Sequence, residues 1–197
     1  MMEIPEKRIK VRIKLLTEML GTVSKDPTVY KTYIENKKPI TVEEDESLTV
    51  EKAEDSGWSG FHKDEEGLFI YEYMIKGFLK QAGNVLKDIL KIKALRSKID
   101  DYVFIDPRRI HFNLNEPHGV LERSLRSMTP AGPRTSLKRS DLINAGTEIE
   151  FDLTLIPHKE ITIETLITLL SYGKKIGLGQ FRNGGYGRFE VISIIEQ

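Results

Sequence analysis

Residues 147–195 read TEIEFDLTLIPHKEITIETLITLLSYGKKIGLGQFRNGGYGRFEVISII, and this stretch decides the fold class. Its first ten positions alternate apolar and polar residues, which is typical of a half-buried strand. The apolar positions are Ile149, Phe151, Leu153 and Leu155. An amphipathic helix over 162–172 follows, and a glycine-rich loop leads from it into a closing strand. Strand, helix and strand in this order predict one half of a split βαβ sheet.

The first half of the chain supplies matching elements. RIKVRIKLL at 8–16 alternates apolar and basic residues, which predicts a strand with a cationic outer face. That face is either an RNA-binding surface or a solvated one. Apolar residues at i, i+3, i+4 and i+7 predict a helix over 75–92. Residues 99–114 predict a β-strand, and Pro107 within it allows only an edge strand or a bend at that point.

Together these segments predict an α+β, ferredoxin-like (RRM-like) fold, with an antiparallel sheet and two helices on one face. The strands are expected near 8–16, 101–113, 147–156 and 187–195.

We expect one domain over 1–197 with two loop insertions. Residues 36–66 are acidic and poor in apolar residues, so they predict a long loop or short hairpin in which Trp58 and Phe61 anchor to the core. Residues 114–141 are rich in Pro, Gly, Ser and Arg, and predict an extended excursion or hairpin.

The composition excludes several kinds of protein. Because there is no cysteine, disulfide bonds, thiolate zinc sites and thiol nucleophiles are excluded. No apolar run approaches the length of a membrane span, and the opening residues lack the apolar block of a signal peptide. We therefore expect a soluble, cytoplasmic protein without membrane contact, cofactor or bound metal.

A net charge of zero conceals a strong segregation of charge along the chain. Residues 35–66 hold eleven acids against four lysines, and residues 74–139 hold fourteen bases against six acids. A local basic excess is the usual footprint of a polyanion-binding site, although lysine-rich helix faces are often only solvated. The acidic 43–55 and basic 123–139 stretches also offer complementary surfaces for self-association.

The most specific motif is the loop GLGQFRNGGYGRF at 177–189, with five glycines in eleven residues. It is neither a Walker loop nor a Rossmann fingerprint, since it follows a helix and leads into a strand. A tight turn is one interpretation. The presence of Arg182 and Arg188, with Phe181 and Tyr186 available for stacking, favours a ligand-binding loop instead.

This loop resembles the C-terminal glycine-rich loop of the RAMP superfamily, the ferredoxin-like RNA-binding proteins of CRISPR systems. Three further segments resemble its backbone subunits, which polymerise along a guide RNA. They are LTEMLG at 16–21, FIYEYMIKGFLK at 69–80 and AGTEIEF at 145–151. The chain departs from the family where its I-P-G-S-S-L-K-G motif reads YEYMIKG at 71–77. The chain also resembles an uncharacterised protein type carried by temperate phages of Gram-positive bacteria.

The resemblance implies a non-catalytic protein that binds single-stranded RNA, oligomerises along it and has CRISPR-like or phage proteins as further partners. The side chains expected to contact RNA are Lys76, Lys80, Arg123, Arg126, Arg182 and Arg188. The backbone N–H groups of Gly179, Gly184 and Gly185 are expected to add donors in a concave nest.

Two alternatives remain open from the sequence. One is an endoribonuclease of the same superfamily, either metal-independent with His62 or His111 or dependent on Asp26. In the cleaving members an Asp in the corresponding segment cuts target RNA, yet Asp26 precedes Pro27 here and reads as the N-cap of a short helix. The other is a phage protein that uses the fold to interact with a host defence complex.

Overall fold

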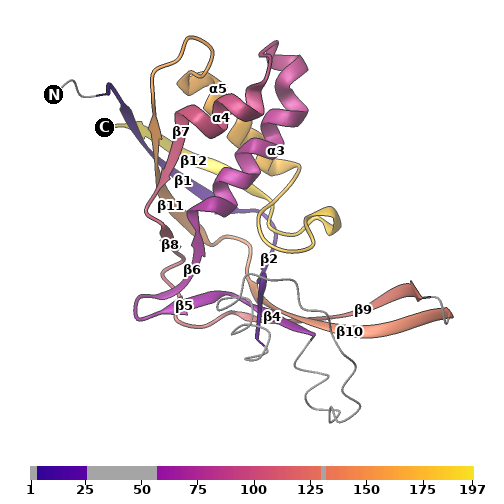
Figure 1. Cartoon of the computed structure of the whole chain (residues 1–197). Helices are drawn as coiled ribbons and strands as arrows, with labels where there is room; N and C mark the ends of the chain where they lie inside the picture. Colours follow the sequence, from indigo (N-terminus) through magenta and orange to yellow (C-terminus); the bar gives the residue numbers. More distant parts are fainter. Residues whose placement is uncertain (1–3, 26–56, 130–131) are drawn as a thin grey trace.

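A four-stranded antiparallel sheet organises the computed structural model, which describes residues 4–25, 57–129 and 132–197 (Figure 1). The strand order is β12, β1, β11, β7, and every neighbouring pair is antiparallel. The strands are β1 Lys7–Leu15, β7 Val103–Asp106, β11 Glu148–Leu155 and β12 Phe189–Glu196. Of these four strands, the first and third in chain order, β1 and β11, are thus central, as a split βαβ arrangement requires.

The described residues form three α-helices, which lie on one side of this sheet (Figure 1). They are α3 Glu72–Leu90, α4 Leu95–Tyr102 and α5 Ile163–Ser171. The helix α3 comes between β1 and β7 in the chain, and α5 comes between β11 and β12. The predicted α+β, ferredoxin-like fold is therefore confirmed.

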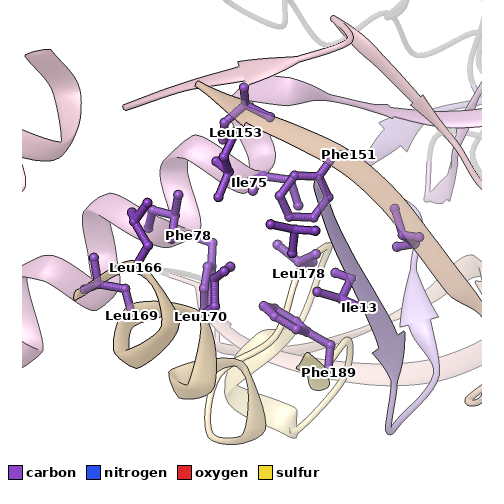
Figure 2. Packing of buried hydrophobic residues seen from close by; sticks show 14 of the residues in the cluster. Ile13, Ile75, Phe78, Phe151, Leu153, Leu166, Leu169, Leu170, Leu178 and Phe189 are labelled. Atoms are coloured by element: carbon purple, nitrogen blue, oxygen red, sulfur yellow. The ribbon is translucent and has the colours of Figure 1, made fainter. Parts of the chain in front are cut away.

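The main core lies between the helices and the inner face of the sheet, as Figure 2 shows. The register pairs Val11 with Phe151 and Ile13 with Ile149, so that β1 and β11 present their apolar residues together. Phe78 of α3 meets Phe189 of β12 with ring centroids 4.9 Å apart. The alternation seen in the sequence is the cause of this core, because every second residue points inward.

The outer face of the sheet carries the basic stripe of β1, and acids of β11 pair with its two middle bases, Lys10 and Arg12. Lys10 lies 3.1 Å from the Glu150 carboxylate, and Arg12 lies 2.9 Å from it. Asp152 and Glu148 lie further along the same face, each 3.9 Å from one of these bases. This face therefore offers a phosphate backbone little net positive charge.

A second sheet projects from the body of the molecule (Figure 1). Its order is β2, β10, β4, β3, with β9 paired to β10 in a long antiparallel hairpin. The strands are β2 Met19–Leu20, β3 Val23–Ser24, β4 Trp58–Gly60, β9 Gly119–Thr129 and β10 Gly132–Ile143. The extended segment expected near 114–141 forms this hairpin.

A third, smaller sheet consists of β5 His62–Asp64, β6 Gly67–Tyr71 and β8 Arg109–His111 in the order β5, β6, β8. The strand material expected over 99–114 is thus divided: α4 ends at Tyr102, β7 joins the main sheet and β8 joins the small one. Pro107 lies between the two strands, where a missing N–H interrupts no ladder.

Trp58 and Phe61 are both held against neighbouring elements. The Trp58 indole N–H donates to the buried Asp141 carboxylate at 2.8 Å, and Phe61 packs edge-on against Phe112. Asp26, the helix expected after it and the acidic stretch 43–55 lie outside the described residues. Among the described helices, none is long and apolar enough to cross a membrane.

Candidate functional site

The glycine-rich loop closes on itself before β12. The N–H of Leu178 donates to the carbonyl oxygen of Gly187 at 2.9 Å, so the two ends of the loop run side by side. A Cβ atom on Gly187 would lie 1.9 Å from the Leu178 oxygen, and its φ of +70° favours glycine. The sequence therefore needs glycine here for close backbone approach.

The segment after β1 anchors the loop. Glu18 accepts the N–H of Gly187 at 2.8 Å, and Leu20 accepts the N–H of Gln180 at 3.1 Å, both through their carbonyl oxygens. The Thr17 hydroxyl donates to the carbonyl oxygen of Gly185 at 2.9 Å and accepts the N–H of Arg188 at 3.0 Å. These bonds fix the loop against the end of β1.

The loop presents Phe181 to solvent, with 45% of the residue exposed. The guanidinium of Arg123, from β9, lies 4.5 Å from the centroid of its ring, and the Tyr186 ring lies 5.8 Å away. A Cβ on Gly184 would come within 2.3 Å of the Phe181 ring, so a glycine leaves room for the ring to lie over the backbone. An exposed aromatic ring beside guanidinium groups suits stacking with a planar ligand.

A polar network holds Arg123 in this position. Its guanidinium donates to the Ser140 hydroxyl at 3.0 Å and to the Gln180 side-chain oxygen at 3.4 Å. Ser59 and Ser140 also donate to the Gln180 oxygen, at 3.0 and 2.9 Å. Gln180 thereby ties the glycine-rich loop to the hairpin and to β4. Arg123 acts in this geometry as a positioning residue for Phe181.

Arg182 and Arg188 provide further positive charge at the loop. Arg182 donates to the side-chain oxygen of Gln81 at 2.8 Å, which links the loop to α3, and Arg188 is exposed. We call this set the glycine-loop surface; it comprises Arg123, Phe181, Arg182, Tyr186 and Arg188.

A shallow hollow along α3 and α4 adjoins this surface. It is lined by Tyr73, Lys76, Gly77, Lys80, Gln81, Asn84, Arg96 and Asp100. Lys80 donates to the Asp100 carboxylate at 2.6 Å, and this bond lowers the pKa of Asp100. Lys80 therefore lies at the expected surface but already has an acidic partner.

The structure gives Lys76 a different role from the predicted RNA contact. Its ammonium group donates to the carbonyl oxygens of Ile99, at 2.9 Å, of Asp100, at 3.0 Å, and of Val103. These groups lie at the C-terminal end of α4, where a helix leaves carbonyls without intrahelical partners. Partial burial lowers the pKa of Lys76. Lys76 thus caps the C-terminal end of α4 while it also lines the hollow beside Lys80.

The predicted backbone nest is also altered by the fold. The N–H groups of Gly184 and Gly185 donate to the carbonyl oxygens of Phe181 and Arg182, each at 2.9 Å, so both are engaged inside the loop. Gly179 has a φ of +80° and packs against Leu20. The backbone of Arg126 belongs to β9, while its side chain lies outside the described part of the hairpin.

The two histidines considered as catalytic candidates share one face of the small sheet. His62 stacks on Phe69 at 5.3 Å, and His111 contacts the same ring at 5.4 Å. The His111 Nε2 atom lies 2.9 Å from the Asp64 carboxylate, which Arg109 also contacts at 2.9 Å.

These surroundings shift two pKa values on this face. Burial, aided by the positive charge of Arg109, lowers the pKa of His62. Partial burial acts to raise the pKa of Asp64, but the hydrogen bonds from His111, Arg109 and the Glu66 backbone lower it overall. Within residues 4–25, 57–129 and 132–197, no group of three His, Asp or Glu side chains could hold a metal ion.

Sequence reasoning did not identify several residues that build the site. Thr17 lies in the segment that resembles the family, and Gln180 lies inside the glycine motif, so both had a local signal. No local sequence signal marked Gln81 or Ser140, because both are distant from the loop in the sequence and contact it only in the folded protein.

No known family model matches the chain, and no curated protein matches it by sequence. Among solved structures, a chain of the "Type III-B Cmr-beta bound to cognate target RNA" is similar in fold, with a TM-score of 0.54 and 13% sequence identity. The match covers 97% of this chain and 60% of that one, so this protein spans a little more than half of its structural neighbour. At this identity the likeness shows a shared fold.

Proposed function

We propose that the protein binds single-stranded RNA through the glycine-loop surface without cleaving it, and that it resembles the guide-RNA-coating backbone subunits of CRISPR effector complexes. The observation that carries the proposal is the exposed Phe181 ring, which has the Arg123 guanidinium and the Tyr186 ring as neighbours. Base stacking on an aromatic ring is tolerant of sequence, and arginines beside it neutralise phosphates.

The fold agrees with this proposal. The neighbouring chain belongs to the Type III-B Cmr-beta bound to cognate target RNA, and 60% of that chain matches 97% of this one in fold. The ion-paired outer face of the main sheet argues for the loop as the RNA surface, since the basic stripe of β1 is matched by Glu148, Glu150 and Asp152.

The contacts proposed for phosphate are Arg182 and Arg188, with Lys80 in the adjoining hollow. Arg126 remains a predicted contact on the hairpin. Arg123 acts through Phe181, and the glycines at 179, 184 and 185 shape the loop so that its side chains reach one ligand.

Fluorescence anisotropy with a labelled single-stranded oligouridine tests the proposal. Affinity should fall with salt, with a logarithmic slope of about −0.7 for each phosphate neutralised. Phe181→Ala should weaken binding about 5- to 150-fold, the equivalent of about 1–3 kcal/mol for one stacked base. Phe181→Tyr keeps the ring and should bind like the wild type. Absence of binding at low salt would overturn the proposal and favour a role in protein–protein interaction.

The endoribonuclease alternative is favoured by one observation, the placement of His62 and His111 around Phe69 with Asp64 bonded to His111. A carboxylate that orients an imidazole is a common feature of acid–base catalysis. Labelled RNA incubated with and without Mg²⁺ or Mn²⁺ decides between the two functions. Under the binding proposal the RNA stays intact. Defined products that disappear in His62→Ala or Asp26→Ala would establish the nuclease instead.

A further inference from the structure

The small sheet has two chemically different faces. Leu68 and Ile70 of β6 join the main hydrophobic core, whereas the intervening Phe69 does not belong to that cluster. Phe69 is nevertheless only 4% exposed, because polar and aromatic side chains cover it on the other face. The register places His62 and His111 on either side of Phe69, and Arg109 beside Tyr71.

The aromatic rings on this outer face form a continuous series that ends at Tyr73 of α3. The His62 ring meets the edge of Tyr71 at 4.7 Å, and Tyr71 stacks on Tyr73 at 5.4 Å with an angle of 19° between the rings. Tyr73 lies in the first turn of α3 and is 58% exposed. Tyr71 already holds the Tyr73 ring in one orientation. A base that stacks on Tyr73 therefore restricts little additional side-chain motion, so the entropic cost of binding is small.

Positive charge lies beside this series. The guanidinium of Arg108 is 5.9 Å from the centroid of the Tyr71 ring, is exposed and makes no ion pair with any described residue. The neighbouring Arg109 differs, since it is bound to Asp64. Arg108 is therefore the arginine on this face that is placed to meet a phosphate next to a stacked base.

The series also connects to the glycine-loop surface. Tyr73 lines the hollow on α3 together with Gly77, Lys80 and Gln81, and Gln81 holds Arg182. Eight residues of helix separate Tyr73 from Gln81, a distance of about 12 Å along the axis. One extended strand of RNA can thus touch both places.

We propose that Tyr73, Tyr71, His62 and Arg108 form a second stacking site for single-stranded RNA, which we call the tyrosine platform. It rests on the proposed function, because it extends the path of the same RNA from the glycine-loop surface along α3. Stacking and one phosphate contact do not depend on base identity, so the platform lengthens the bound segment without adding a sequence preference.

Two RNA lengths test this inference. Labelled oligouridines of about 4 and about 16 nucleotides span the range of binding-site sizes known for single-strand binders. Tyr73→Ala and Arg108→Ala should each weaken binding of the long RNA, by about 5- to 150-fold for the lost stacking interaction. The short RNA, which cannot occupy the whole of both surfaces at once, should lose less affinity than the long one. Tyr73→Phe should behave as the wild type.

A control for lost positive charge lies on the outer face of the main sheet, where Arg8→Ala removes an exposed guanidinium that is paired with Glu6. It should leave the affinity for either RNA unchanged. Photocrosslinking of a 5-bromouridine RNA should additionally map to Tyr73 or Tyr71. Unchanged long-RNA affinity in folded Tyr73→Ala and Arg108→Ala would overturn the platform while the proposed function stands. Loss of all wild-type binding would overturn the proposed function itself.

Discussion

At the scale of single residues, Gly187 shows most directly how the sequence fixes the loop. An alanine there would meet the Leu178 oxygen at 1.9 Å and would also have to adopt a φ of +70°. We expect Gly187→Ala to lower the free energy of unfolding by about 1–2 kcal/mol for the left-handed conformation and by about 1–3 kcal/mol more for the clash. Urea-induced unfolding measures both effects together.

Gly146→Ala is the matched control for that prediction. Gly146 has a φ of +91°, but no atom lies within 4 Å of a Cβ built on it. It should therefore show the conformational cost alone, about 1–2 kcal/mol. Equal destabilisation in the two variants would show that the close approach of Gly187 to Leu178 does not contribute.

His62 gives a prediction about pH. Its pKa is lowered in the folded protein, so the unfolded chain binds more protons at mildly acidic pH. The stability contributed by the neutral imidazole should be complete above the unfolded pKa of about 6.5 and should be lost as pH falls through the folded value. Thermal unfolding from pH 8 to pH 5 should therefore change less in His62→Gln than in the wild type. Identical pH profiles would contradict this assignment.

Lys76 explains why residue type alone did not predict the site. In the sequence it is one of several lysines near the start of a basic helix, and only the fold places it beneath the end of α4. A partly buried lysine that donates to three carbonyl oxygens looks the same in the sequence as a fully solvated one. Arg182 and Arg188 differ from Lys76 because the glycines around them already indicated a ligand-binding loop in the sequence.

At the scale of elements, long periodic segments were predictable and short ones were not. The strands β1 and β11 and the helix α5 lie within a residue or two of the predicted bounds, because each repeats its apolar period several times. In contrast, β5 and β8 have three residues each, which is too short for an alternation to be recognised. In α4 only Leu95 and Ile99 are buried, so its pattern was missed and its residues were read with the following strand.

Mutations can distinguish between the two basic surfaces considered for RNA binding, the stripe of β1 and the glycine-loop surface. We expect Lys10→Ala combined with Arg12→Ala to leave RNA affinity within about twofold of the wild type, because Glu148, Glu150 and Asp152 offset these bases and keep phosphates away. Arg182→Ala combined with Arg188→Ala should lower affinity and reduce the salt slope by about 0.7 for each phosphate that is no longer neutralised. Anisotropy over a range of salt concentrations measures both variants. The reverse result would place RNA on the sheet.

At the scale of the whole molecule, the site depends on contacts that join distant parts of the chain. Thr17, Gln81, Arg123 and Ser140 all meet the loop at 177–188, and they come from four different elements or connections. The split βαβ arrangement of the main sheet was predictable, because it follows from the sequence of alternating strands and helices. The hydrogen bonds that aim Phe181 could not be predicted, since they depend on the exact position of the hairpin beside the loop.

Self-association along RNA is the prediction that belongs to this scale. A head-to-tail contact between identical subunits does not close on itself, so it produces a filament when a long ligand aligns the copies. The basic 123–139 stretch of the hairpin is the predicted surface for such a contact, with the acidic 43–55 stretch as its expected counterpart. The mass measured by light scattering should therefore grow with the length of the RNA. Lys138→Glu should reduce this growth while the protein still binds a short RNA, because it places a like charge opposite the acidic stretch. Isolated monomers on a long RNA, seen by electron microscopy at saturating protein, would show that the subunits bind without contacting one another.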